Sequence, residues 1–209
     1  IQSNSDNLTE KKVLDFIDIP LVSNKKYEII YADPPWQFSN KKTGGTMKSG
    51  ASSHYLTTGI NGLKDIDVAS IAAKDCTLIM WWVGAMPQEA IDLVKAWGFT
   101  LKNMNGFVWN KLTVKDKPFF GMGFRTRAGS ESAIIATRGK PKVCSRSIRA
   151  VQTLKASTHS KKPIEFRDLI IAMCGDLPKL EMFARGTSIG WDVFGNEAHG
   201  SISITHKKT

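Results

Sequence analysis

Short apolar runs alternate with amphipathic segments along most of the chain. Residues 27–32 (YEIIYA) and 77–83 (TLIMWWV) are two such runs, each rich in β-branched or aromatic residues. Their length and composition predict strands. The second run is almost wholly apolar, as is typical of a strand that is buried on both faces. Three further strands are predicted over residues 107–109, 132–137 and 179–184.

The segments between these strands carry apolar residues at helical spacing. Residues 86–97 show this period, and Gly98 follows them as a stop signal. Residues 163–174 begin with proline and are followed by Gly175, which is the usual punctuation of a helix. A shorter helix is expected over residues 65–73.

This alternation predicts an α/β domain with a mainly parallel central sheet and helices on both faces. In such sheets the active residues lie at the carboxyl ends of the strands. Two segments without periodicity, residues 39–53 and 111–128, are expected to be long loops. No linker divides the chain, so we expect one domain over residues 27–200, with a polar leader (1–26) and a basic tail (201–209).

The charge of the chain changes this picture, because 29 Lys and Arg residues against 19 Asp and Glu residues give a net charge of +10. A surplus of this size favours a polyanionic partner, and nucleic acid is the first candidate. A charge that serves only solubility is the alternative explanation.

The cysteines and the hydropathy pattern exclude several other classes. The three cysteines, Cys76, Cys144 and Cys174, have no CxxC spacing, so neither a disulfide framework nor a zinc site is expected. No other metal-ligand spacing is present, and a reducing compartment is the simplest interpretation. No apolar run reaches the roughly 18 residues that a membrane span needs. We therefore expect no membrane association and a cytoplasmic location.

Asp33-Pro34-Pro35-Trp36 follows the first predicted strand and carries the strongest chemical signal. An exocyclic amine of adenine is a poor nucleophile, and it must be oriented before it can attack an electrophilic carbon. The Asp33 carboxylate and the Pro34 carbonyl can each accept one of its N–H groups. The consecutive prolines stiffen the turn, and Trp36 offers a flat face for a base that has left its stack. A plain strand-to-loop turn is the alternative interpretation.

The motif and several further segments together resemble the MT-A70 family of adenine-N6 methyltransferases. The resemblance covers residues 27–200 and rests on ordered pieces of sequence: IIYADPPW, HYLT, LIMWWVG, FVWNK, GFRTRAGSESAIIATRGKP, HSKKPIEF, KLEMFAR and GWDVFGNE. It implies a Rossmann-like class I methyltransferase fold in which the catalytic motif precedes the cofactor motifs. It also implies S-adenosylmethionine as the cofactor and S-adenosylhomocysteine as its product.

The resemblance further implies roles for single residues at the cofactor. Lys162 would lie near the methionine carboxylate, and Asp33 would lie beside the sulfonium. Arg185, Asn196 and Glu197 would contact the ribose and adenine. The expected cofactor-binding residues are Asp33, Ser160, Lys162, Arg185, Asn196 and Glu197.

Other residues are expected at the substrate. Lys41, Lys42 and Lys48 lie in the glycine-rich loop after the motif, which is either a lid that grips nucleic acid or a solvated loop. Glu131 either holds Arg125 or Arg127 in place or touches the substrate. The expected catalytic residues are Asp33, Pro34, Pro35 and Trp36, and the expected substrate-binding residues are Trp36, Lys41, Lys42, Tyr55, Trp82, Lys111, Arg125, Arg127 and Glu131.

We therefore expect direct methyl transfer to adenine N6, with no covalent enzyme intermediate and no metal. DNA is favoured over RNA because the chain is small and shows no appended RNA-binding module. It resembles the small bacterial or phage DNA-modifying members of the family, which implies a bacterium or a phage-infected host. An RNA enzyme, a non-catalytic nucleic-acid-binding subunit on the same fold, and an enzyme for a protein glutamine amide stay open. A homodimer or a sister-subunit partner also stays open.

Overall fold

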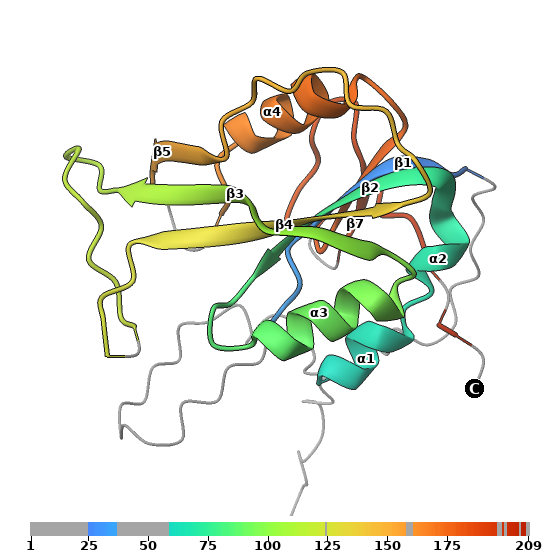
Figure 1. The fold of residues 1–209 in the computed structure, drawn as a ribbon, viewed down its shortest axis with the longest axis horizontal. Coiled ribbons are helices and arrows are strands. Elements are labelled where there is room, and N and C mark those ends of the chain that lie inside the picture. Colours follow the sequence, from blue (N-terminus) through green and yellow to red (C-terminus); the bar gives the residue numbers. More distant parts are fainter. Residues whose placement is uncertain are drawn as a thin grey trace, which may run out of the picture.

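The computed structural model describes residues 25–36, 59–123, 125–157, 161–195, 198, 200–204 and 206–207. Their core is a seven-stranded sheet in the order β5-β3-β4-β2-β1-β6-β7 (Figure 1). The strands are β1 (Tyr27–Ala32), β2 (Ala72–Trp82), β3 (Thr100–Leu112), β4 (Ser130–Arg138), β5 (Val151–Lys155), β6 (Lys179–Met182) and β7 (Asp192–Phe194). The helices are α1 (Ile60–Asp65), α2 (Val68–Ile71), α3 (Pro87–Ala96) and α4 (Glu165–Cys174).

The strand directions make the two ends of the strands different from each other. β4 pairs antiparallel with both β2 and β3, and all other neighbouring pairs are parallel. Six strands therefore end at one edge, and β4 begins there. The mainly parallel sheet expected from the sequence is confirmed, and this edge is the one at which active residues gather in α/β sheets.

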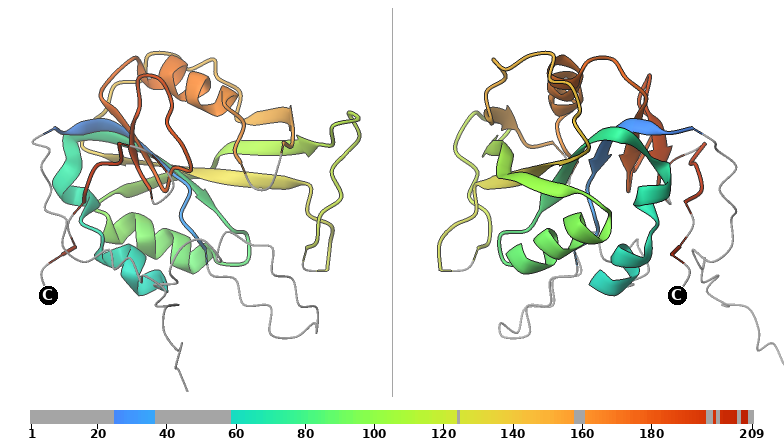
Figure 2. Two further views of the ribbon diagram at one scale, coloured as in Figure 1. Left: turned by 180° about the vertical axis from the view of Figure 1, so that it is seen from behind. Right: turned by 45° about the vertical axis from the view of Figure 1, so that its right-hand side comes forward.

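Helices cover both faces of the sheet, as predicted (Figures 1 and 2). Because side chains alternate along a strand, successive residues of β1 and β2 enter different layers. Ile30 and Leu78 pack in the layer with α1, α2 and α3, while Ile29 and Ile79 pack in the layer with α4. Residues 29–32 of β1 and 76–81 of β2 are buried, which explains the continuous apolar runs there.

The two long helices follow the punctuation in the sequence. α3 occupies residues 87–96 of the predicted segment, and Gly98 after it has a φ of 84°. α4 ends at Cys174, and Gly175 has a φ of 92°. Both glycines hold a left-handed conformation that other residues adopt at a cost, so each helix stops where it was expected to stop.

The predicted helix over residues 65–73 is wrong. Two short helices, α1 and α2, lie on either side of Asp67, and β2 already begins at Ala72. Ala72 pairs with Tyr27 of β1, so pairing with a distant strand overrides the local preference of the segment. The prediction also missed β5 and β7.

Two other boundaries differ. The loop predicted over residues 111–128 is present, but Lys111 and Leu112 still belong to β3. β6 ends at Met182, because Phe183 has a left-handed φ of 62°. Beyond residue 200, Ile202 and Ile204 pack against the layer that holds α1, α2 and α3. Within the described ranges, no helix is long and apolar enough to cross a membrane.

Candidate active site

Asp33-Pro34-Pro35-Trp36 leaves β1 at the edge where the parallel strands end. The Asp33 N–H donates to the carbonyl of Met182 on β6, at 3.3 Å. The Trp36 N–H donates to the Pro34 carbonyl, at 2.9 Å, and so closes a three-residue turn around Pro35. This turn fixes the direction of the Pro34 carbonyl. A carbonyl oxygen has two lone pairs, so it can accept from a second donor.

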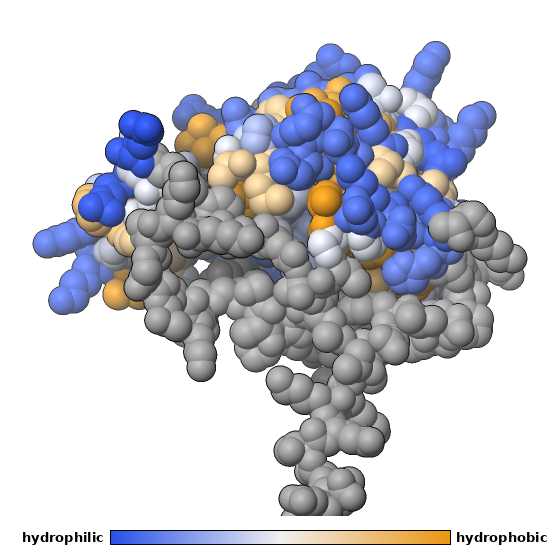
Figure 3. Space-filling view, turned by 90° about the horizontal axis from the view of Figure 1, so that it is seen from below, coloured by the Kyte–Doolittle hydropathy of each residue, from blue (hydrophilic) through white to orange (hydrophobic). Residues whose placement is uncertain are grey.

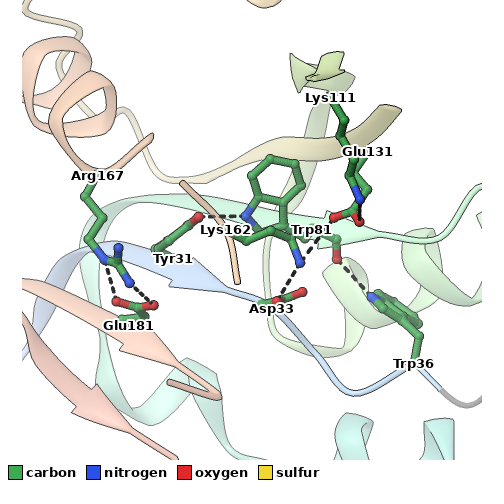
Figure 4. Close-up of polar contacts among 9 residues, drawn as sticks. All are labelled: Tyr31, Asp33, Trp36, Trp81, Lys111, Glu131, Lys162, Arg167 and Glu181. Atoms are coloured by element: carbon green, nitrogen blue, oxygen red, sulfur yellow. Dashed lines mark hydrogen bonds and ion pairs between the residues drawn. The ribbon is translucent and has the colours of Figure 1, made fainter. Parts of the chain in front are cut away.

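Trp36 is tied to the neighbouring strand. Its indole N–H donates to the carbonyl oxygen of Trp81 on β2, at 3.0 Å (Figure 4). The ring is half-buried against the layer of α1, α2 and α3. A pocket of about 270 Å³ lies beside it, lined by Pro35, Trp36, Gly59, Ile60, Leu63, Met86 and Glu89. The sequence predicted a stacking face at Trp36, and this hollow lies next to that residue.

A chain of alternating charges begins at the motif and runs along the edge of the sheet. The Lys162 ammonium lies 2.6 Å from Asp33 Oδ2 and 3.3 Å from Glu131 Oε2 (Figure 4). Glu131 also forms an ion pair with Lys111. We call Asp33, Lys162, Glu131 and Lys111 the charge chain. They come from the end of β1, the segment before α4, the start of β4 and the end of β3.

The charge chain is mostly withdrawn from solvent, yet the pKa shifts of Lys162 and Glu131 favour the charged form of each. The Lys162 side chain is 10% exposed, whereas that of Asp33 is 32% exposed. Burial alone would lower the pKa of Lys162, but Asp33 and Glu131 outweigh it and raise that pKa. Burial alone would raise the pKa of Glu131, but Lys162 and Lys111 outweigh it and lower that pKa. The site therefore keeps a fixed, paired cation beside a partly exposed carboxylate.

Aromatic rings line the same edge. The Lys162 ammonium lies 5.3 Å from the centre of the Trp81 ring, and that of Lys111 lies 4.6 Å from the centre of the Trp109 ring. Trp81 is held in turn by Tyr31, whose hydroxyl accepts from the indole N–H at 2.7 Å. Such cation–π contacts stabilise an ammonium where water is scarce.

A second buried ion pair lies behind the charge chain. Arg167 of α4 donates to both carboxylate oxygens of Glu181 on β6, at 2.7 and 2.6 Å (Figure 4). Its guanidinium also lies 5.9 Å from the centre of the Tyr31 ring. This pair joins a helix to the sheet.

The four members of the charge chain were all predicted site residues, and the structure brings them together. Of the two alternatives for Glu131, the pairing with Arg125 or Arg127 is wrong, because Glu131 pairs with Lys111 and Lys162. Those arginines are exposed in the loop between β3 and β4. Contact of Glu131 with the substrate stays a prediction. Lys162 was expected at the methionine carboxylate of the cofactor, and that role stays a prediction.

Two predicted residues lie apart from the charge chain. Trp82 packs in the layer that holds α1, α2 and α3, on the other side of the sheet from Trp81. Its indole N–H donates to the carbonyl of Met104 at 2.9 Å. Arg185 is exposed in the segment after β6. Other predicted positions lie outside the described residues, namely Lys41, Lys42, Lys48, Tyr55, Ser160, Asn196 and Glu197.

Trp81 is the residue of this site that the sequence did not reveal. It lies in the apolar run 77–83, which predicts a strand buried on both faces, and it is buried. However, its carbonyl holds Trp36 and its ring faces Lys162. Its position at the end of a strand next to the motif strand was the one available signal.

The arrangement has a definite chemical capacity. A partly exposed carboxylate and an adjacent, fixed carbonyl can accept both N–H groups of a planar amine. The carboxylate can also favour positive charge that develops close to it. The open edge of a mainly parallel α/β sheet is where such a site receives its ligands.

The fold and the motif after β1 define a Rossmann-like methyltransferase. The sequence model of the MT-A70 family matches residues 27–197, most of the chain, so the protein belongs to the MT-A70 family. Methyltransferases of this family generally use S-adenosylmethionine.

Three relatives illustrate the range of the family. The type II methyltransferase M.MunI of Mycoplasma sp is 34% identical over 195 residues, which cover 85% of this chain and 80% of M.MunI. The N(6)-adenosine-methyltransferase MT-A70-like protein of Drosophila melanogaster is 24% identical over 194 residues, which cover 90% of this chain but 29% of that protein. Human N(6)-adenine-specific methyltransferase METTL4 is 24% identical over 192 residues, 85% of this chain and 39% of METTL4.

Proposed function

We propose that this protein transfers a methyl group from S-adenosylmethionine to the exocyclic amine of an adenine in DNA. The observation that carries the proposal is the pair of acceptors at Asp33 and Pro34. The carboxylate is partly exposed at the open edge of the sheet, and the neighbouring carbonyl is fixed by the turn around Pro35. Membership in the MT-A70 family supports the reaction type.

The residues at this edge fit S-adenosylmethionine. The cofactor carries a sulfonium, an α-ammonium and a carboxylate, and the site offers the Asp33 carboxylate for a cation and the Lys162 ammonium for an anion. A cation that already has two carboxylate partners can accept a third anion by rearranging its contacts. Arg185, Ser160, Asn196 and Glu197 stay proposed contacts to the rest of the cofactor.

When bound, S-adenosylmethionine supplies the methyl group and departs as S-adenosylhomocysteine. A bond forms between the methyl carbon and adenine N6, and the carbon–sulfur bond breaks. Asp33 accepts a hydrogen bond from the amine as positive charge develops on the nitrogen, and the surplus proton then passes through this partly exposed carboxylate to solvent. Asp33 and Pro34 align the amine, and the half-buried Trp36 ring limits access of water from one side.

The choice of DNA as the substrate rests on two observations. M.MunI, a type II methyltransferase, matches this chain over most of the length of both proteins. The chain also carries a net charge of +10, which suits a polyanion. RNA is the alternative, because the relative from Drosophila melanogaster is named an N(6)-adenosine-methyltransferase, and adenosine is a ribonucleoside. The chain spans 29% of that relative.

A direct assay tests the proposal. The protein is incubated with S-adenosylmethionine carrying a labelled methyl group and with DNA or RNA of matched random sequence. The products are digested to nucleosides and separated by mass. We expect labelled N6-methyldeoxyadenosine from the DNA and little product from the RNA.

The control is the Asp33→Asn variant, which keeps the shape of the side chain and loses its charge. Label in N6-methyladenosine from RNA alone would replace the DNA assignment. Label in another nucleoside, or label retained on the protein, would refute the adenine-N6 reaction.

A further inference from the structure

The loop between β3 and β4, residues 113–129, projects from the edge of the sheet at which the charge chain lies (Figures 1 and 2). Its described residues have their own hydrogen bonds. Gly121 and Ala128 exchange two backbone hydrogen bonds, at 2.7 and 3.2 Å, and Leu112 bridges to Pro118. A Cβ atom at Gly121 would lie 2.7 Å from the carbonyl oxygen of Ala128, so glycine permits this close approach. These contacts give the described part of the loop a defined backbone conformation.

The loop exposes large hydrophobic side chains. The described part of the protein has eight exposed large hydrophobic side chains, and four of them lie in this loop, namely Val114, Phe119, Phe120 and Met122. Phe120 is 75% exposed and Met122 is 76% exposed. In Figure 3, hydrophobic and strongly hydrophilic groups lie side by side at the left, where this loop projects. Large apolar side chains that are exposed together in one segment are typical of a surface that binds a partner.

The charges around these side chains indicate the chemistry of the partner. Lys115, Lys117, Arg125 and Arg127 give the loop four cations, and Asp116 is its one carboxylate. Asp116 is neutralised by Lys155 of β5, at 2.8 Å. The Arg127 guanidinium lies 4.9 Å from the centre of the Phe120 ring. Cations interleaved with exposed apolar and aromatic side chains suit a polyanion with apolar bases.

The base of the loop belongs to the active site. The Phe119 N–H donates to the Lys111 carbonyl at 3.0 Å, and the Lys111 N–H donates to the Gly129 carbonyl at 2.8 Å. The Lys111 ammonium lies 5.5 Å from the centre of the Phe119 ring and pairs with Glu131. A partner that contacts this loop therefore sits beside the same charge chain that ends at Asp33.

We propose that this loop is a wedge that enters duplex DNA beside the target adenine. This inference rests on the proposed function. Phe120 and Met122 insert next to the base step from which the adenine leaves, and the four cations bind the flanking phosphates. Apolar side chains of these types unstack base steps in other DNA-binding proteins, and an adenine inside a duplex must leave its stack before its amine can react.

The test compares two DNA duplexes that share the sequence methylated by the wild-type protein. In one, the target adenine is paired with thymine. In the other, it faces an abasic position, so less work is needed to extrude it. The double variant Phe120→Ala, Met122→Ala is expected to lower kcat/KM on the paired duplex about tenfold and on the abasic duplex less than about twofold.

The matched control is Val143→Ala. Val143 is also an exposed apolar side chain, but it follows the opposite end of β4. This variant should leave kcat/KM unchanged on both duplexes. A second readout replaces the target adenine with 2-aminopurine, whose fluorescence rises when the base unstacks. The wild-type protein and Val143→Ala should give the same rise, and the double variant a smaller one.

Several results would overturn the wedge. One is an equal loss of rate on both duplexes, and another is no loss on the paired duplex. A third result combines two measurements: light scattering shows an oligomer for the wild-type protein and a monomer for the double variant, and kcat/KM falls equally on both duplexes. The loop would then bind a protein chain and not DNA. Failure of the wild-type protein to methylate either duplex would instead refute the proposed function, which separates the two claims.

Discussion

Two ion pairs connect the region of α4 to the sheet, and they differ in geometry and in exposure (Figure 4). Arg167 meets both oxygens of Glu181, and the two side chains are 11% and 12% exposed. Lys162 meets one oxygen of Asp33 and shares its charge with Glu131. In the first pair both carboxylate oxygens accept from Arg167. In the second pair the carboxylate of Asp33 is 32% exposed to solvent.

The choice of cation explains this difference. Guanidinium is a planar fork that fits a carboxylate in one geometry, so the pair of Arg167 with Glu181 suits a fixed connection between α4 and β6. An ammonium is a compact charge on a flexible stem, and it can exchange one anion for another. The lysine pair therefore suits a site where a ligand must enter. The pair of Arg167 with Glu181 thus has the geometry of a fixed structural contact, and the pair of Lys162 with Asp33 has the geometry that the proposed reaction needs.

Removal of the Asp33 carboxylate should have the largest effect. We expect Asp33→Ala to lower the rate of methyl transfer by about 10³-fold, because the amine loses an acceptor that is aligned with it. Folding should be largely kept, since Lys162 retains Glu131 as a partner. Transfer of labelled methyl groups and thermal unfolding would be measured on the same preparation. A near-normal rate would contradict the proposed mechanism.

The structural pair should respond in the opposite way. Arg167→Leu leaves the Glu181 carboxylate buried without its partner, which should lower the free energy of unfolding by about 3 kcal/mol. Urea unfolding measures this loss, and the activity of each folded molecule should change far less than in Asp33→Ala. The double variant Arg167→Leu, Glu181→Leu should recover part of the stability. A loss of activity without a loss of stability would show that this pair serves the reaction.

The smallest effect should come from Glu131 and should depend on pH. Burial would raise the pKa of Glu131, but Lys162 and Lys111 hold it below its ordinary value of 4.5. A lowered pKa means that this carboxylate stabilises the fold above about pH 4.5, and that this contribution is lost as the pH falls through the folded value. Glu131→Gln should therefore be less stable than wild type by roughly 1–2 kcal/mol at pH 7.

Urea unfolding of both proteins from pH 7 down to pH 3.5 checks this expectation. The difference should be constant above about pH 5 and should shrink below pH 4.5. Lys162 does not add to the slope in this range, because its raised pKa lies above its ordinary value of 10.5. A difference that grows as the pH falls would show that Glu131 is not stabilised by the two lysines.

The sequence predicted those parts of the fold whose signals are local. β1 and β2 are short apolar runs with clear ends, and α3 and α4 are closed by Gly98 and Gly175. β5 and β7 were missed because they have five and three residues. β5 lies at the edge of the sheet and alternates only between exposed and half-buried positions, so its apolar signal is weak.

The candidate site shows the same division. Asp33-Pro34-Pro35-Trp36 could be predicted, because the chemistry lies within four consecutive residues. The charge chain could not, since Lys162 is 129 residues from Asp33 and meets it only when α4 packs on the sheet. For Glu131 the sequence offers the nearby arginines or the substrate as partners, because closeness in sequence is the only guide to an ion pair. β3 and β4 in fact bring Lys111 beside Glu131.

The reversed direction of β4 bears on how such a protein diverges during evolution. Antiparallel neighbours need only a loop between them, whereas parallel neighbours need a longer crossover. Residues 113–129 can therefore lengthen, shorten or change in sequence while β3 and β4 keep their register. The motif after β1 and the tip of the proposed wedge thus lie in different segments, so a descendant can change the tip while conserving the motif.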